Sequence, residues 1–330
     1  MVDSNTVLQH RKKALEILRS SSTPVPVHML AGELGVTRVA LWKLVRKLQE
    51  LGYPIRTSRE GYLLPKNQDP DLLCPWELDT FGGRIEWFPS TSSTMEESKR
   101  FSGSEDLLIC TVAETQTAGR GRFHRPWESP PGGIYLTLTW TRHIPLAVAG
   151  RYPLLAGVSW IQTLEELFPH RFGHSSRSRI SLKWPNDILA GGKKIGGVLL
   201  DMDVEGDTVT RIHLGIGLNI RNRPRDPNAI ALVDLMGSSI PPRRRILSSY
   251  LHRMERALKD PYLKGIIPEW KRFSSTLGKR VRIRFPGGRR AGIPAFEGIA
   301  EDIGPGGELL VRTSDGSPRA VHYGDCHHLI

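Results

Sequence analysis

Residues 119–127 read Gly-Arg-Gly-Arg-Phe-His-Arg-Pro-Trp, and they follow an apolar run, 107–112, with the composition of a β-strand. Three guanidinium groups and two glycines lie within these nine residues. Arginine offers paired donors to phosphate or carboxylate oxygens, glycine lets the backbone approach a ligand, and tryptophan offers a flat face for a ring. We interpret this segment, called the arginine loop below, as a loop that folds over an anionic ligand. An exposed basic turn is the alternative.

A second polar cluster follows further along the chain. Residues 183–187, Lys-Trp-Pro-Asn-Asp, close one expected strand, and Lys194-Ile-Gly-Gly opens the next. Lys194 lies eleven positions after Lys183, enough for two antiparallel strands and a turn, so their charged ends can meet. Polar groups at strand ends beside apolar strands are typical of a binding pocket. A hairpin corner is the alternative, because Pro-Asn-Asp favours turns, and Trp184 alone is interpreted as a core residue.

The N-terminal residues have the pattern of a winged helix-turn-helix. Apolar periodicity predicts helices over 11–19, 27–34 and 39–51, with Thr37 as N-cap of the third, and a hairpin wing over 53–64. Residues 1–66 carry 11 Lys and Arg against 5 Asp and Glu, a net +6 out of +12 for the whole chain. A packing module with a solvated basic face is the alternative to DNA binding. The candidate DNA contacts are Thr37, Arg38, Lys43, Arg46, Lys47, Arg56 and Arg59.

The rest of the chain predicts two further domains after a polar linker at 65–75. Expected strands lie at 85–88, 107–112, 134–140, 180–184, 195–202 and 211–220, and expected helices at 94–101, 152–168, 243–258 and 266–273. This mixture without a regular βαβ period favours an α+β domain. Short β runs at 280–285, 296–303, 308–313 and 320–323 predict a small antiparallel barrel of the SH3-like kind. The predicted domains are 1–66, 67–276 and 277–330.

Composition restricts the setting in which the protein works. No apolar run reaches the roughly 18 residues that span a bilayer, and the first 13 residues lack the apolar segment of a secretory signal. The three cysteines have unrelated spacings, which favours neither a disulfide framework nor a metal site. We expect a reduced, cytoplasmic protein without membrane attachment or a dedicated metal site, and the pI of about 9.8 favours polyanionic partners.

Four segments together, 115–122, 183–187, 194–197 and 215–220, resemble the biotin protein ligases in order and spacing. The order of the three predicted domains is similar to that of the bifunctional members of this family, which are also repressors of biotin operons. The resemblance covers nearly the whole chain. It implies that biotin and ATP with Mg²⁺ give biotinyl-5'-adenylate. A lysine of a biotin carboxyl carrier protein domain, of acetyl-CoA carboxylase or a related enzyme, then receives the biotin.

The resemblance also implies roles for individual residues. Lys194, Arg120, Lys183 and Asp187 match catalytic positions, and Asp187 would orient the incoming amine or a metal-bound phosphate. The implied biotin contacts are Ser93, Thr94, Met95, Gln116, Arg120, Gly121, Arg122 and Lys194. The implied ATP and adenylate contacts are Arg122, Arg125, Trp127, Asn186 and Asn219. Ser93 and Thr94 also fit a helix cap, which is compatible with ligand binding.

Three positions depart from the family pattern. His124 stands where a small residue is usual, Phe123 where a basic residue is common, and Met95 where asparagine is usual. A bulky side chain restricts φ in the loop. The resemblance further implies that the adenylate acts as corepressor and favours a homodimer on operator DNA. A biotin-sensing repressor with decayed ligase activity, and a lipoate or octanoate ligase, are the alternative functions.

Overall fold

The computed structural model describes residues 4–78, 81–101, 108–172, 180–237, 240–286 and 293–329. The chain forms two compact units, Met1–Asp79 and Thr80–Ile330. Within the described ranges, every helix is too short or too polar to cross a membrane.

The N-terminal unit contains a helix-turn-helix and a two-stranded wing. Its elements are α1 (Ser4–Ser20), α2 (Val27–Leu34), α3 (Arg38–Glu50), β1 (Arg56–Thr57), β2 (Tyr62–Leu63) and the 3-10 turn η1 (Pro75–Glu77). Gly35, with φ +62°, turns the chain after α2, a left-handed conformation that glycine adopts without strain. The hydroxyl of Thr37 accepts a hydrogen bond of 3.2 Å from the Ala40 amide, so the predicted N-cap is confirmed.

The segment predicted as a linker packs on these helices. Arg19 of α1 binds Asp69 at 2.8 Å and Glu77 at 2.6 Å. Leu73 is fully buried, and the Arg11 guanidinium lies 4.5 Å from the centre of the Trp76 ring. Residues 67–78 therefore belong to the N-terminal unit. The sequence did not indicate this, because their contacts with α1 are tertiary and leave no periodic signal.

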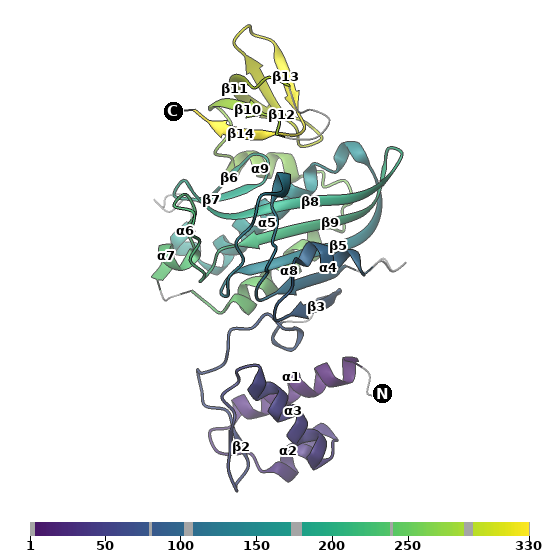
Figure 1. Ribbon diagram of the computed structural model, residues 1–330, viewed down its shortest axis with the longest axis vertical. Coiled ribbons are helices and arrows are strands. Elements are labelled where there is room, and N and C mark those ends of the chain that lie inside the picture. The colour runs from purple at the N-terminus through teal and green to yellow at the C-terminus, as the bar shows by residue number, and fades with distance from the viewer. Residues whose placement is uncertain are drawn as a thin grey trace. The chain divides into compact units, whose positions relative to one another are not determined.

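The second unit is built around a seven-stranded sheet in the order β3-β4-β5-β9-β8-β7-β6 (Figure 1). Strands β3 and β4 are parallel, and the other neighbours are antiparallel. This confirms the predicted α+β class. Leu107, the first residue of one expected strand, lies outside the described residues. The strands are β3 (Arg84–Phe88), β4 (Ile109–Ala113), β5 (Ile134–Pro145), β6 (Ile180–Lys183), β7 (Asp187–Ala190), β8 (Lys193–Glu205) and β9 (Thr208–Leu218).

Helices cover the sheet. Gly157 of α5 lies against Leu182 of β6, and Trp160 of α5 stacks on Tyr250 of α8 with ring centres 4.0 Å apart. Side chains alternate along a strand, so Leu182 and its neighbour Lys183 point to opposite faces of the sheet, and α5 covers the face away from Lys183. The helical elements are α4 (Thr94–Lys99), η2 (Arg122–His124), η3 (Leu146–Val148), α5 (Arg151–Leu167), α6 (Pro169–Phe172), α7 (Leu232–Met236), α8 (Arg243–Ala257) and α9 (Ile266–Phe273).

The C-terminal part of this unit is a small antiparallel sheet in the order β13-β12-β11-β10-β14 (Figure 1). The predicted small C-terminal β domain is confirmed. Its described strands form an open sheet with β13 and β14 at the two edges, where a closed barrel would pair them. The strands are β10 (Arg280–Arg284), β11 (Phe296–Ile303), β12 (Leu309–Thr313), β13 (Pro318–Val321) and β14 (Asp325–His328). The indole N–H of buried Trp184 donates to the carbonyl of Gly307 at 3.0 Å, which joins this sheet to the end of β6.

Candidate active site

A cavity of about 400 Å³ lies over strands β8 and β9 and is bordered by every residue that the sequence assigned to a ligase site. The structure therefore brings the arginine loop, the 183–187 run and the glycine-containing strands together. The predicted residues that line the cavity are Ser93, Thr94, Met95, Gln116, Arg120, Gly121, Arg122, Arg125, Trp127, Lys183, Asn186, Asp187, Lys194 and Asn219.

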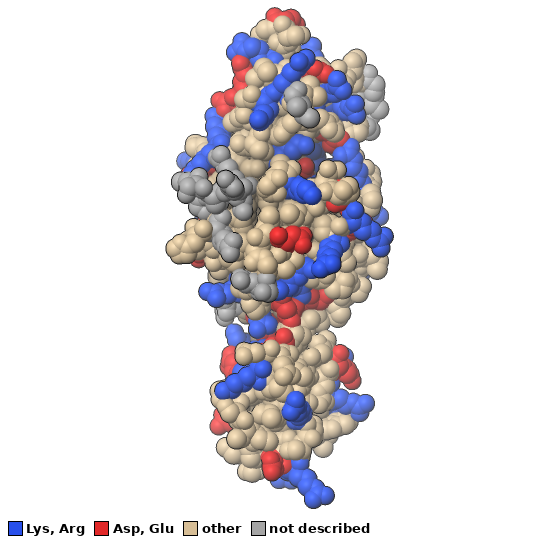
Figure 2. All heavy atoms as spheres, turned by 90° about the vertical axis from the view of Figure 1, so that its left-hand side faces the viewer, with Lys and Arg blue, Asp and Glu red and all other residues tan. Residues whose placement is uncertain are grey.

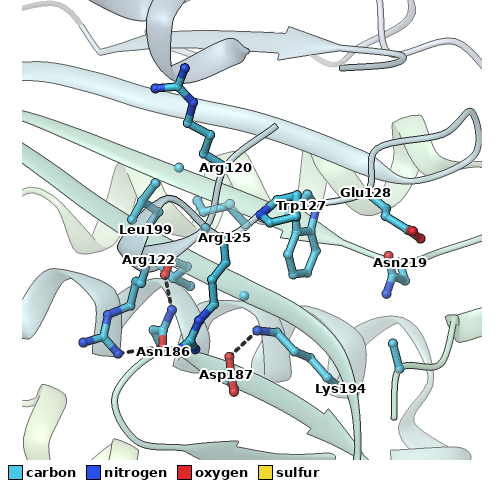
Figure 3. A pocket seen from close by; sticks show the side chains of 18 of the residues that line it. Arg120, Arg122, Arg125, Trp127, Glu128, Asn186, Asp187, Lys194, Leu199 and Asn219 are labelled. Atoms are coloured by element: carbon cyan, nitrogen blue, oxygen red, sulfur yellow. Dashed lines mark hydrogen bonds and ion pairs between the residues drawn. The ribbon is translucent and has the colours of Figure 1, made fainter. Parts of the chain in front are cut away.

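A cation from β8 and a carboxylate from β7 meet beside this antiparallel pair of strands. The Lys194 ammonium nitrogen lies 2.5 Å from Oδ1 of Asp187 (Figure 3). Asp187 is also the register partner of Lys183 across β6 and β7. The Lys194 backbone is held on both sides, since its N–H donates to Asn228 and its carbonyl accepts from Ile230. Two lysines distant in sequence thus border the same cavity, as the spacing predicted.

The Trp127 ring packs against two glycines of the central strands, where no side chain separates it from the backbone. Gly197 and Gly217 are register partners across β8 and β9. A Cβ atom at Gly217 would be 2.5 Å from the indole nitrogen of Trp127, and one at Gly197 would be 3.5 Å from the ring. The Lys194 ammonium lies 5.3 Å from the ring centre. Among the described residues, the Trp127 indole N–H is buried without a hydrogen-bond partner, so it leaves a donor for a ligand.

Hydroxyl and amide groups gather at the start of α4. Oε1 of Gln116 accepts hydrogen bonds from the Thr94 amide at 2.8 Å and from its hydroxyl at 3.1 Å. The Thr137 hydroxyl donates to Thr94 at 3.0 Å. Ser93 occupies the N-cap position of α4, but its hydroxyl makes no capping hydrogen bond. Gln116 takes over that function, which leaves the Ser93 hydroxyl beside the cavity.

Met95 supplies an apolar surface next to these polar groups. Its side chain is 8% exposed, and its methyl carbon lies 2.9 Å from the position that a Cβ at Gly215 would take. Methionine adapts its shape to irregular space, so it fills the gap above the glycine of β9. The site therefore combines a polar end with an apolar wall formed partly by Met95.

The C-terminal sheet contributes to this site, which the sequence interpretation missed. Arg122 donates to the Gly324 carbonyl at 3.0 Å and to Asn186 Oδ1 at 3.4 Å. Arg125 makes a two-point ion pair with Asp325, in which one hydrogen bond measures 3.2 Å. Asp325, Cys326 and His327 all line the cavity. No signal in the sequence joins Arg125 to a residue 200 positions away.

Arg120 is placed differently from the other loop arginines. Its side chain is 51% exposed, and its guanidinium lies 3.8 Å from Glu96. Figure 3 shows it pointing away from Lys194 and Asp187. The structure therefore brings Arg120 to the rim of the cavity, while Arg122 and Arg125 point toward the 183–187 run.

The two unusual residues of the loop occupy left-handed conformations. Phe123 has φ +57° and His124 has φ +58°. Residues with a Cβ atom rarely adopt such angles, so the backbone is strained at both positions. The Phe123 ring packs edge-on against Tyr323, with ring centres 5.1 Å apart, and this contact holds the strained turn against the C-terminal sheet.

Burial shapes the chemistry of two groups at the cavity. It lowers the pKa of Arg122, whereas the charges of Asp325 and Asp187 oppose that change. Arginine has so high a pKa that the guanidinium keeps its charge. Burial raises the pKa of the Cys326 thiol to about 12, so the thiol is neutral at pH 7 and unsuited to act as a nucleophile.

The predicted DNA contacts are all solvent-exposed in the N-terminal unit, including Arg38, Lys43 and Arg46 on α3. The ammonium of Lys47 lies 3.2 Å from Glu50, an exposed pair that is weak in water. Arg56 on β1 and Arg59 in the following turn bring basic side chains to the wing. Figure 2 shows Lys and Arg side chains spread over one face of this unit.

A mixed α+β domain with a cationic cavity, joined to a winged helix-turn-helix and a small C-terminal β sheet, is the architecture of ligases that carry a regulatory DNA-binding module. The biotin/lipoate A/B protein ligase family matches residues 85–219. A helix-turn-helix domain matches residues 10–63, and the biotin protein ligase C-terminal domain matches residues 276–329.

Individual relatives agree with these matches. The bifunctional ligase/repressor BirA of Bacillus subtilis is 30% identical over 93% of this chain and 95% of its own length. The biotin–[acetyl-CoA-carboxylase] ligase of Mycobacterium tuberculosis is 32% identical over 69% of this chain and 82% of its own length. A structure of the Aquifex aeolicus biotin protein ligase with biotin and ATP is 25% identical, covers 74% of this chain and 98% of its own, and superposes with a TM-score of 0.57. The chain belongs to the biotin protein ligase family, in the arrangement of the bifunctional ligase/repressors.

Proposed function

We propose that this protein activates biotin with ATP to biotinyl-5'-AMP and transfers the biotin to a lysine of a biotin carboxyl carrier protein domain. We further propose that its N-terminal unit represses biotin genes with the adenylate as corepressor. The observation that carries the ligase proposal is the convergence of Lys194, Asp187, Arg122 and Trp127 on one cavity. These side chains supply the cations and the flat aromatic surface that a carboxylate and a nucleotide need.

In the first step a biotin carboxylate oxygen attacks the α-phosphorus of ATP, and pyrophosphate leaves. Two anions approach one another, so cations directed at the developing charge give the main stabilisation. Lys194 takes this role, with Asp187 holding its ammonium at 2.5 Å. Arg122 and Arg125 would bind phosphate oxygens, and Trp127 would stack on the nucleotide with Asn186 and Asn219 nearby. Mg²⁺ bound to ATP would neutralise phosphate charge.

Biotin would lie with its ureido ring at the start of α4. Ser93, Thr94 and Gln116 offer the hydroxyl and amide groups that such a ring requires. Met95 covers the apolar part of the ligand. In the second step the carrier lysine attacks the acyl carbon and AMP leaves, and Asp187 orients the incoming amine.

The N-terminal unit would bind operator DNA as part of a homodimer. Helix α3 exposes Arg38, Lys43 and Arg46, which suits phosphate contacts along a major groove. An adenylate that binds the dimer more tightly than the monomer would shift the monomer–dimer equilibrium toward the dimer. The protein would carry out both functions in the cytoplasm.

A pyrophosphate-release assay with biotin and lipoate in direct competition tests the substrate. We expect release that depends on biotin and is unaffected by excess lipoate. Preference for lipoate would favour a lipoate ligase. Biotin binding without pyrophosphate release would favour a sensor that has lost its ligase activity.

A further inference from the structure

Helix α3 exposes an apolar stripe on the face opposite its buried side. Val39 is 65% exposed and Trp42 is 50% exposed. These residues lie three positions apart and therefore neighbour each other on the helix surface. Leu41, Val45 and Leu48 face the core instead. Packing within the described N-terminal unit therefore does not account for the Val39–Trp42 stripe.

Basic side chains surround this stripe. The Arg46 guanidinium lies 5.3 Å from the centre of the Trp42 ring, and the Arg46 side chain remains 62% exposed. Lys43, four positions after Val39, is exposed as well. A partner for this surface must offer negative charge together with apolar groups at the same spacing.

The major groove of DNA meets both requirements. Phosphates line its edges, and the 5-methyl group of thymine is the apolar feature that base pairs present there. The hydrogen bond of 3.2 Å from the Ala40 amide to Thr37 fixes the first turn of α3, which carries Val39. This turn is where recognition helices contact base edges.

We propose that Val39 and Trp42 determine sequence specificity by packing against thymine methyl groups in the operator. This inference rests on the proposed operator binding and adds the base that α3 recognises. Lys43 and Arg46 would contact phosphates and contribute affinity for any sequence.

The test begins with selection of bound duplexes from a random DNA library by the full-length protein with biotin, ATP and Mg²⁺. The enriched duplex is then synthesised with deoxyuridine in place of each thymidine in turn, which removes only the methyl group. We expect about fourfold weaker binding for each contacted methyl, the transfer free energy of one carbon.

Substitutions identify the residues that sense the methyl groups. Trp42→Ala should bind the thymidine and deoxyuridine duplexes equally at the position it contacts, whereas Trp42→Phe should retain discrimination. Val39→Ala should lose discrimination at a neighbouring position. The control Lys43→Ala should weaken binding to all duplexes alike and keep the methyl effect.

Two results would overturn the inference while leaving DNA binding intact. One is that the wild-type protein binds every deoxyuridine duplex as tightly as the thymidine duplex. The other is a Trp42→Ala variant with unchanged DNA affinity and discrimination but an altered oligomeric state, which would make the stripe a protein contact. Enrichment of no sequence at all would instead refute the proposed operator binding and the inference with it.

Discussion

The ammonium of Lys194 lies 2.5 Å from the carboxylate of Asp187, which links the second residue of β8 to the first residue of β7 at the cavity. This pair places a fixed positive charge beside the carboxyl end of the 183–187 run. Because both side chains remain partly exposed, the pair contributes little to stability. We infer that the ion pair orients the Lys194 side chain for catalysis.

The first prediction concerns this lysine. Lys194→Ala should reduce the rate of biotin-dependent pyrophosphate release by about 100-fold to 1000-fold, as expected for loss of one charge-stabilising donor. The melting temperature should stay close to that of the wild type. Near wild-type release by a folded Lys194→Ala variant would exclude the proposed role.

The second prediction concerns Arg122, which reaches Asn186 and the Gly324 carbonyl. Arg122→Ala should let biotinyl-5'-AMP escape into solution, because a guanidinium that closes the site is lost. The measurement is the rate at which preformed labelled adenylate leaves the enzyme. Unchanged retention would argue against a closing loop.

The third prediction tests the contribution of the C-terminal sheet. Asp325→Ala should raise KM for ATP because Arg125 loses its two-point partner. In the double variant Arg125→Ala with Asp325→Ala, loss of Asp325 should add nothing to the KM of Arg125→Ala. Glu301→Gln, which breaks the exposed Arg312 pair on the same sheet, is the matched control and should leave KM unchanged. A further rise in KM on removing Asp325 from the Arg125→Ala variant would contradict a positioning role for the pair.

The fourth prediction concerns the backbone under Trp127. Gly217→Ala places a methyl group 2.5 Å from the indole nitrogen, so the ring must move. We expect about tenfold or greater weakening of ATP binding by calorimetry, typical of an overpacked site. Gly265→Ala is the control, since a Cβ there meets no atom within 4 Å. Equal ATP affinity of both variants would show that the ring position is unimportant.

The fifth prediction concerns pH. Burial lowers the pKa of His328 to about 4, helped by the charge of Lys183. Nε2 of the neutral ring shares a hydrogen bond of 3.1 Å with the Thr276 hydroxyl, whose oxygen accepts a hydrogen bond from the Trp184 amide. The unfolded chain binds the proton first, near pH 6.5, so the stabilisation is present above that pH and is lost as the pH falls toward 4.

The expected size of this effect is about 1–2 kcal/mol in the free energy of unfolding, discounted because the ring is only half-buried. Urea unfolding at pH 7 and pH 4.5 measures it. His328→Gln should reduce the difference between the two pH values, whereas substitution of exposed His322 by Gln should not. An identical pH dependence for both variants would contradict the assignment.

Much of the fold could be predicted because local patterns and tertiary packing agree. Residues 27–34 and 266–273 form helices with the predicted bounds, where apolar periodicity is flanked by Gly35 in one case and Gly265 in the other. Strand β14 was not predicted. It contains one apolar residue, Cys326, and it forms by pairing with the distant strand β10.

The same reason limits the prediction of the site. The two lysines that border the cavity lie at or near strand ends, where spacing indicates that they can meet. The contacts of Arg122 and Arg125 with residues 324–325 depend on how the C-terminal sheet docks, and no local pattern encodes that docking. The Arg120 side chain is directed toward Glu96 at the start of α4, a tertiary contact that no local pattern indicates.

The most direct test of the central claim is mass spectrometry of an intact biotin carboxyl carrier domain incubated with this protein, biotin, ATP and Mg²⁺. A parallel reaction contains lipoate in place of biotin. We predict the mass of one added biotin on the carrier lysine and no addition of lipoate. An unmodified carrier in both reactions, from a protein that still binds biotin, would contradict the ligase assignment.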